Sequence, residues 1–290
     1  MNSHINMTAA LLLLINCAAV AEEQHVAVKF DAVVGDKAFV CGQSYDNIGI
    51  TQSRITPSDF RFFISAVELL DERGKAVALT LDQDEVWQYQ DVALLDFEDG
   101  TGPCHNGNPG LHREITGRAP KGDYRGVRFT LGVPFELNHG DPTIAPSPLN
   151  LTAMFWVWQA GYKFVKIDMA TTGQPQAAET AEKQKRRASG FPIHLGSTDC
   201  ASASLTTPPS GCKNPNRLTL TFNNFDLEKN SVIADVAVLL NETNVDINAT
   251  DTAPGCMSSP VDTDCAQVMP AFGLPFGGNA AAQQRFFKVR

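Results

Sequence analysis

The sequence is poor in basic residues. Its 23 Lys and Arg residues are outnumbered by 32 Asp and Glu residues, which gives a formal net charge of -9. Proteins that hold nucleic acid through its phosphates need a basic surface, and so do proteins that bind anionic membranes. We therefore expect no nucleic-acid partner.

Long apolar runs are also scarce, and the most apolar segment is the first 21 residues, MNSHINMTAALLLLINCAAVA. Its apolar run from Met7 through Leu14, followed by Asn16 and Cys17, is too short and too interrupted to span a bilayer, which takes about 20 apolar residues. Its small-residue ending resembles a secretory signal peptide that is cleaved after Ala21. We expect a single domain over residues 22–290, exported to the periplasm or secreted, and no membrane insertion.

Several catalytic signatures are missing from the sequence, namely GxSxG, HExxH, a P-loop and a GxGxxG turn. The CxxC spacing typical of zinc sites is missing as well. Acidic pairs such as Asp96 and Glu98 are common in surface turns. The sequence therefore predicts a protein that is not an enzyme.

Helical periodicity is rare, whereas short segments rich in β-branched and aromatic residues recur along the chain. Several of them alternate apolar and polar residues, which is typical of strands with one solvated face. The pattern predicts an all-β fold, an antiparallel sandwich or open barrel with long disulfide-stapled loops. The predicted strands are 25–34, 59–70, 76–81, 126–133, 152–159, 162–168, 217–225 and 231–240.

Three segments fall outside this pattern. Residues 170–190 are polar and end in a basic cluster, so we expect a solvated, mobile loop. Residues 139–150 contain three prolines and should form a stiff connection. Residues 256–290 are rich in Gly, Pro and Ala and should form an irregular tail.

Six cysteines remain after removal of the leader. An even number of cysteines in an exported chain indicates disulfides, although six cysteines allow 15 pairings. We expect the two local pairs, Cys200 with Cys212 and Cys256 with Cys265, which leaves Cys41 with Cys104.

The segment MFWVWQAGYKFVKID, residues 154–168, contains two of the three tryptophans of the chain. On an extended strand Met154, Trp156 and Trp158 would project from one face. A methionine beside tryptophan usually fills a gap in a core, so packing alone could explain the row.

Two histidines lie near features that could hold a metal ligand still. His139 stands at the start of the proline-rich connection, and His194 precedes a predicted disulfide. Imidazole and thioether donors together suit copper, particularly Cu(I), and Met154 could supply the sulfur. For either histidine alone, a hydrogen bond to a turn is the simpler interpretation.

A set of motifs in one order resembles the MbnP family, also called the four-Cys member of the metallo-mystery pair, which is found beside methanobactin operons and other copper-handling genes. The resemblance extends from about residue 25 to residue 270. It rests on FVCG at Cys41, PSDFRFFIS around Asp59, VALLDFEDGTGPC, GVPFELNH, MFWVWQAGYKF, HLGSTDC and GCMSSP.

The resemblance implies a copper-binding protein of copper homeostasis that holds a single Cu(I). It also implies a partner, a di-haem MauG/cytochrome c peroxidase-like enzyme of the MbnH type, which oxidises the first tryptophan of the WxW motif to kynurenine. That residue is Trp156 here, and Trp158 is a packing neighbour or an electron relay.

The family ligands are a histidine and a methionine, with kynurenine beside the metal and solvent completing its shell. Met154 is the expected methionine and Met257 its competitor, while His139 and His194 both remain candidates. The alternative function is a metal-free secreted β-sandwich that binds carbohydrate or protein.

Overall fold

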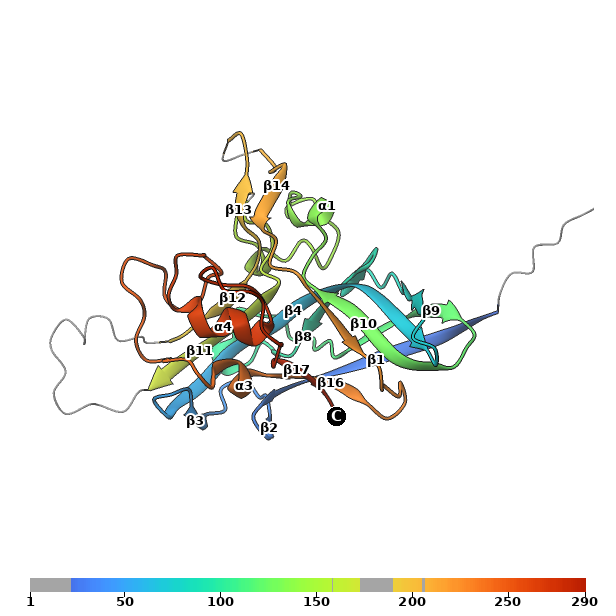
Figure 1. Cartoon of the computed structure of the whole chain (residues 1–290), viewed down its shortest axis with the longest axis horizontal. Helices are drawn as coiled ribbons and strands as arrows, with labels where there is room; N and C mark the ends of the chain where they lie inside the picture. Colours follow the sequence, from blue (N-terminus) through green and yellow to red (C-terminus); the bar gives the residue numbers. More distant parts are fainter. Residues whose placement is uncertain (1–21, 158, 173–189, 205–206) are drawn as a thin grey trace, which may run out of the picture.

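The computed structural model describes residues 22–157, 159–172, 190–204 and 207–290. Two β-sheets form the framework of this part of the chain, with short helices beside them (Figure 1). The predicted all-β sandwich is therefore confirmed. The predicted signal peptide, Trp158 and residues 173–189 of the predicted mobile loop lie outside the described residues.

The smaller sheet has the strand order β17-β16-β1-β9-β6, with β2 paired to β1. β1 runs parallel to β16, and the other pairs in this sheet are antiparallel. Its strands are β1 (Glu23–Val34), β2 (Lys37–Ala38), β6 (Thr80–Leu81), β9 (Glu114–Pro120), β16 (Ser231–Asp235) and β17 (Phe287–Val289).

The larger sheet has the order β12-β11-β4-β10-β15, and β3, β5, β7 and β8 join it off this path. Its strands are β3 (Tyr45–Ile48), β4 (Ser53–Asp71), β5 (Ala76–Ala78), β7 (Gln88–Tyr89), β8 (Val92–Asp96), β10 (Tyr124–Leu131), β11 (Val165–Thr172), β12 (Ile193–Leu195) and β15 (Leu218–Phe222).

Shorter elements complete the described fold. A separate hairpin joins β13 (Thr198–Ala201) to β14 (Gly211–Asn214). The α-helices are α1 (Phe135–Asn138), α3 (Val236–Leu240) and α4 (Cys265–Phe272), and the 3-10 helices are η1 (Gly102–Cys104) and η2 (Thr152–Met154). No helix in the described ranges is long and apolar enough to cross a bilayer.

Phenylalanine rings hold the two sheets together. Phe30 of β1 packs edge-on against Phe129 of β10 at 5.5 Å and against Phe62 of β4 at 6.1 Å between ring centroids. Phe287 of β17 contacts Phe62 at 5.5 Å. Since these rings come from both sheets and are almost completely buried, the core lies between the sheets.

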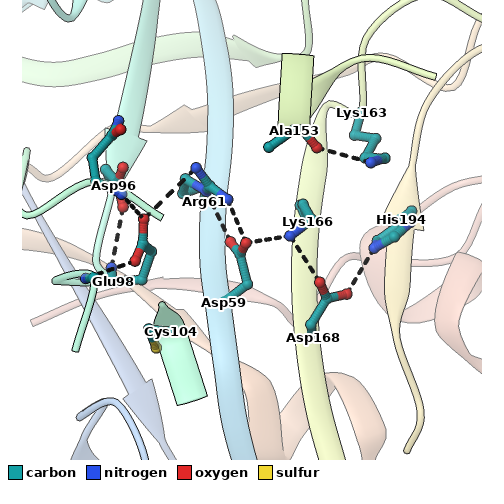
Figure 2. Close-up of polar contacts among 12 residues, drawn as sticks. Asp59, Arg61, Asp96, Glu98, Cys104, Ala153, Lys163, Lys166, Asp168 and His194 are labelled. Carbon is teal, nitrogen blue, oxygen red and sulfur yellow. Dashed lines mark hydrogen bonds and ion pairs between the residues drawn. The ribbon is translucent and has the colours of Figure 1, made fainter. Parts of the chain in front are cut away.

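The opposite face of the larger sheet is also covered, but it carries charges. In register, Asp96 of β8 pairs with Arg61 of β4, Arg61 with Lys166 of β11, and Lys166 with His194 of β12. Cross-strand partners project from the same face, so these four side chains form one row (Figure 2). Arg61 and Asp96 are completely buried, at 1% and 0% exposure.

A loop after β8 covers one end of this row. The Glu98 carboxylate accepts hydrogen bonds from the backbone N–H of Gly100 at 2.9 Å and of Asn108 at 2.6 Å. A Cβ atom on Gly107 would lie 1.6 Å from Glu98 Oε1, so only glycine fits there. The buried carboxylate therefore determines the path of this loop.

The three expected disulfides are present: Cys41–Cys104, Cys200–Cys212 and Cys256–Cys265. Cys200 and Cys212 are direct cross-strand partners in the β13–β14 hairpin. The Cys256–Cys265 bond attaches a segment beside β12 to the start of α4.

The predicted strand 152–159 is wrong. Residues 152–154 form η2, and the chain then reverses direction, since Trp156 N–H donates to Gly161 O at 3.0 Å and Gly161 N–H donates to Val157 O at 2.7 Å. Gly161 adopts φ 74°, a left-handed conformation that glycine favours. Gly161 indicates a turn, whereas the alternation of aromatic residues around it indicates a strand. The turn is what forms.

Two further expectations fail in part. The predicted strand 231–240 ends at Asp235, whose side chain caps α3 by accepting the N–H groups of Ala237 and Val238. The segment 256–290, expected to be irregular, contains α4 and β17. Both helices are too short for periodicity to stand out.

The buried carboxyl group of Asp96 gives a pH prediction. Burial raises its pKa to about 8, against the opposing effect of Arg61. The folded state thus keeps a proton that the unfolded chain has already lost above pH 5, so rising pH between 5 and 8 favours unfolding by up to about 1.4 kcal/mol per pH unit.

We expect Asp96→Asn, which cannot ionise, to flatten this dependence. Urea denaturation of both proteins at pH 5 and pH 8 measures it. Parallel pH profiles for the two proteins would contradict the assignment.

Candidate metal centre

The residues expected to form a site meet at the edge of the larger sheet where β12 lies. The first component is the tryptophan hairpin, residues 154–157 and 159–164, which is closed by the bridge Phe155↔Tyr162 and by a hydrogen bond of 2.7 Å from Lys163 N–H to Met154 O. Tyr162 is completely buried, and its ring lies 5.6 Å from that of Phe63 in β4. The hairpin is therefore fixed on the charged face of the sheet.

Trp156 leaves this hairpin toward β12. Its indole is half-buried, and its ring centroid lies 6.3 Å from that of His194 at an interplanar angle of 50°. A Cβ atom on Gly196 would lie 2.5 Å from Trp156 Cζ3. The missing side chain at Gly196 therefore creates the space that the indole occupies.

His194 is held by both its backbone and its ring. Its backbone pairs with Lys166, and its Nε2 lies 2.7 Å from Asp168 Oδ1 (Figure 2). Burial alone would raise the pKa of Asp168, but the hydrogen bond and charge of His194, together with Lys166, lower it below its usual range. Asp168 is therefore an ionised acceptor.

The charges continue from Asp168 into the sheet. Lys166 Nζ lies 2.8 Å from Asp168 Oδ2 and also contacts the carboxylate of Asp59. Arg61 holds that carboxylate from the other side, with Nε 2.9 Å from Asp59 Oδ1. Each buried charge thus has a partner of opposite sign, as buried charges require.

A second lysine lies at the base of the hairpin. Lys163 Nζ donates to the backbone oxygen of Ala153 at 2.8 Å. Burial lowers its pKa to about 8, and the nearby charge of Lys166 acts in the same direction. This lysine braces the residue before Met154.

Residues 255–258 run beside the other edge of β12. His194 N–H donates to Cys256 O at 2.9 Å, and Cys256 N–H donates to Pro192 O at 3.0 Å. This isolated parallel bridge pairs Ile193 with Cys256, so Met257 directly follows the bridged residue on one segment as His194 does on the other. Met257 is half-buried.

Ser258 ties the same two segments together. Its hydroxyl donates to His194 O at 2.9 Å and accepts from Gly196 N–H at 3.1 Å. The segment that contains Met257 is thus fixed on both sides of His194.

Met154 occupies a different environment. It is completely buried and belongs to the hydrophobic core cluster. The next residue, Phe155, is extended at φ -113° and ψ 144°, so Met154 and Trp156 leave the backbone toward the same side. Met154 and Trp156 thus share one side of the backbone as expected, although the predicted strand is absent.

His139 lies at the C-terminal end of α1 and is 5% exposed. Its Nε2 is 3.5 Å from Cys212 Sγ, and Figure 1 shows α1 beside the β13–β14 hairpin. His139, Cys200 and Cys212 bring three potential ligand atoms within 4.8 Å of one another. Both sulfurs are in a disulfide, however, and a metal ligand must be a thiolate.

The neighbour of His139 supports the tryptophan hairpin. Asn138 Oδ1 accepts the N–H of Tyr162 at 2.8 Å, and Asn138 Nδ2 is 3.4 Å from Ser197 Oγ. The structure therefore brings His194 into contact with Trp156. His139 lies beside Cys212, and its neighbour Asn138 binds the hairpin.

The space at Gly196 gives a prediction. Gly196→Ala should displace the Trp156 ring and destabilise the fold by about 1–3 kcal/mol, as overpacking does. Near-UV circular dichroism and urea denaturation measure both effects. Gly211→Ala is the control, because nothing lies within 4 Å of a Cβ atom added there. Equal, small effects of the two substitutions would contradict the packing of the indole on Gly196.

Comparisons with known proteins identify the family of the chain. A family model described as MbnP matches residues 23–258, a range that contains the hairpin, β12 and Met257. Among solved structures, MbnP from Methylosinus trichosporium is similar with a TM-score of 0.80 and 31% sequence identity, over 92% of this chain and 98% of that chain. No curated protein matches. The chain belongs to the MbnP family.

Proposed function

We propose that this protein binds one Cu(I) ion in copper homeostasis, at a site beside β12 that depends on oxidation of Trp156 to kynurenine. The observation that carries the proposal is the contact between the Trp156 and His194 rings, whose centroids are 6.3 Å apart, beside the bridge that joins Cys256 to Ile193. Membership of the MbnP family supports it.

The residues present fit a soft metal ion. An imidazole, a thioether and a half-buried aromatic residue form a donor set that suits Cu(I) better than a hard cation. The positive charge of Lys166, which contacts the Asp168 carboxylate beside His194, is neutralised by Asp59 and Asp168. The preference of the bound ion for soft ligands would supply the affinity, while the chain positions the donors and limits solvent access.

His194 is the proposed imidazole ligand, because it contacts Trp156 directly. Met257 is the preferred thioether, since it follows Cys256, the bridge partner of Ile193, just as His194 follows Ile193. Met154 is the alternative, on the side of Trp156. His139 is proposed to support the hairpin, next to the disulfide Cys200–Cys212.

The proposed partner is a di-haem MauG/cytochrome c peroxidase-like enzyme that oxidises Trp156. Trp156 is half-buried and its neighbour Val157 is 54% exposed, so an enzyme docked on the hairpin could reach the indole. In the unmodified chain the indole fills the space above Gly196. Opening the ring replaces this bicycle with an amine and a ketone, and so would make room beside His194.

Three disulfides favour an oxidising compartment, the periplasm or the exterior. The alternative function, carbohydrate binding through surface aromatics, has less support. Both tryptophans in the described part of the chain are half-buried, and each packs against a histidine ring. Trp87 stacks on His112 with ring centroids 5.3 Å apart, and Trp156 packs on His194, so neither ring is fully exposed as a ring in a flat sugar-binding surface would be.

The role of Trp156 is tested by Trp156→Phe, which cannot be converted to kynurenine. Coexpressed with the di-haem partner, the unsubstituted protein should carry about one equivalent of copper and the variant much less. Peptide mass mapping of residues 151–166 should find kynurenine at position 156 only in the former. Normal copper uptake by Trp156→Phe would refute the proposed dependence.

The choice of thioether is tested by a pair of matched substitutions, Met257→Leu and Met154→Leu. Each keeps the volume and should cost less than about 1.5 kcal/mol of stability. Competition with a Cu(I) chelator should show a large loss of affinity for Met257→Leu and little change for Met154→Leu. The reverse result would assign the sulfur to Met154.

A further inference from the structure

The two ring nitrogens of His194 have different surroundings. Nε2 lies 2.7 Å from Asp168 Oδ1, whereas the Trp156 ring and the segment of Met257 flank the residue. A neutral imidazole carries its proton on either nitrogen, and the hydrogen bond of one nitrogen determines which one can bind a metal.

We propose that Asp168, oriented by Lys166, is a positioning residue that keeps the proton of His194 on Nε2 and leaves Nδ1 as the donor for a soft metal ion. This inference rests on the proposed function, because it concerns the same site. Asp168 itself would not touch the metal.

The two oxygens of Asp168 have separate tasks. Oδ1 faces His194, and Oδ2 faces Lys166 Nζ at 2.8 Å (Figure 2). An ionised carboxylate only accepts hydrogen bonds, so His194 must donate from Nε2. Lys166 occupies the second oxygen and thereby prevents the carboxylate from turning.

Lys166 is itself held in place. It contacts Asp59, whose carboxylate is fixed by two contacts from Arg61. Arg61 and Asp59 are 1% and 3% exposed, and Lys166 is 8% exposed. The orientation of His194 at the sheet edge is therefore connected to a rigid group of charges inside the protein, across β12, β11 and β4.

Asp168→Asn tests the role of the carboxylate specifically. An amide has one acceptor oxygen, and Lys166 has only donors, so the lysine should take that oxygen. The amide nitrogen then faces Nε2 of His194 and donates to it. The proton of the imidazole should move to Nδ1, the nitrogen proposed to bind the metal.

Long-range 1H–15N NMR spectra of the copper-free protein report directly which nitrogen is protonated, with His194→Gln used to assign the signals. The unsubstituted protein should show the proton on Nε2 and Asp168→Asn should show it on Nδ1. Asp235→Asn is the matched control, since Asp235 is a buried carboxylate paired with Lys288 in the other sheet. It should leave the His194 signals unchanged.

Copper affinity gives a second measurement, by competition with a Cu(I) chelator. Removal of such a supporting carboxylate typically lowers metal affinity about 10–100-fold. We expect that loss for Asp168→Asn and not for Asp235→Asn. Asp168→Glu keeps two acceptor oxygens and should retain the proton on Nε2 and most of the affinity.

Each result decides the inference. A proton on Nδ1 in the unsubstituted protein overturns it, even if no variant folds. Retention of the Nε2 proton in Asp168→Asn also overturns it, even when the protein takes up copper normally. A shifted proton with unchanged affinity overturns the assignment of Nδ1 as donor. Failure of the proposed function is separate, because it would appear as an unsubstituted, partner-treated protein that binds no copper.

Discussion

Pairing of buried charges on one face of the larger sheet is the constraint on which the candidate centre depends. Arg61 and Lys166 are enclosed by protein and share the carboxylate of Asp59 between them. Breaking such a pair leaves an uncompensated charge in a region of low polarity, which typically costs 3–5 kcal/mol. The group therefore resists rearrangement, and Asp168 and His194 extend it to the edge of the sheet.

Rigidity at this edge comes from three independent attachments. β12 pairs with β11 on one side and with residues 255–258 on the other, and the tryptophan hairpin packs over it through Trp156. Asn138 holds the far end of the hairpin through Tyr162. The donors of the proposed site would thus be held in position before an ion arrives, as precise metal sites require.

Much of the fold could be predicted from the sequence, since alternation and β-branched residues identify β1, β4 and β10, and cysteine spacing suggests the three disulfides. The strand predicted over residues 152–159 is wrong, because Gly161 turns a chain whose aromatic pattern resembles a strand.

The candidate site was only partly predictable. Lys166 and Asp168 alternate on β11 in the way that solvated positions do, and nothing in one sequence reveals that a hairpin covers them. The choice between the two histidines likewise depends on which strand lies beside β11. The bridge that brings the segment of Met257 beside β12 joins Ile193 to Cys256, residues more than 60 positions apart.

The bond between Cys256 and Cys265 also has a consequence for the order of maturation. It anchors the segment that carries Met257 to the start of α4, in addition to the hydrogen bonds that hold this segment beside β12. In a thiol-rich cytosol the chain would lack that anchor. Formation of this disulfide would thus come before completion of the proposed centre.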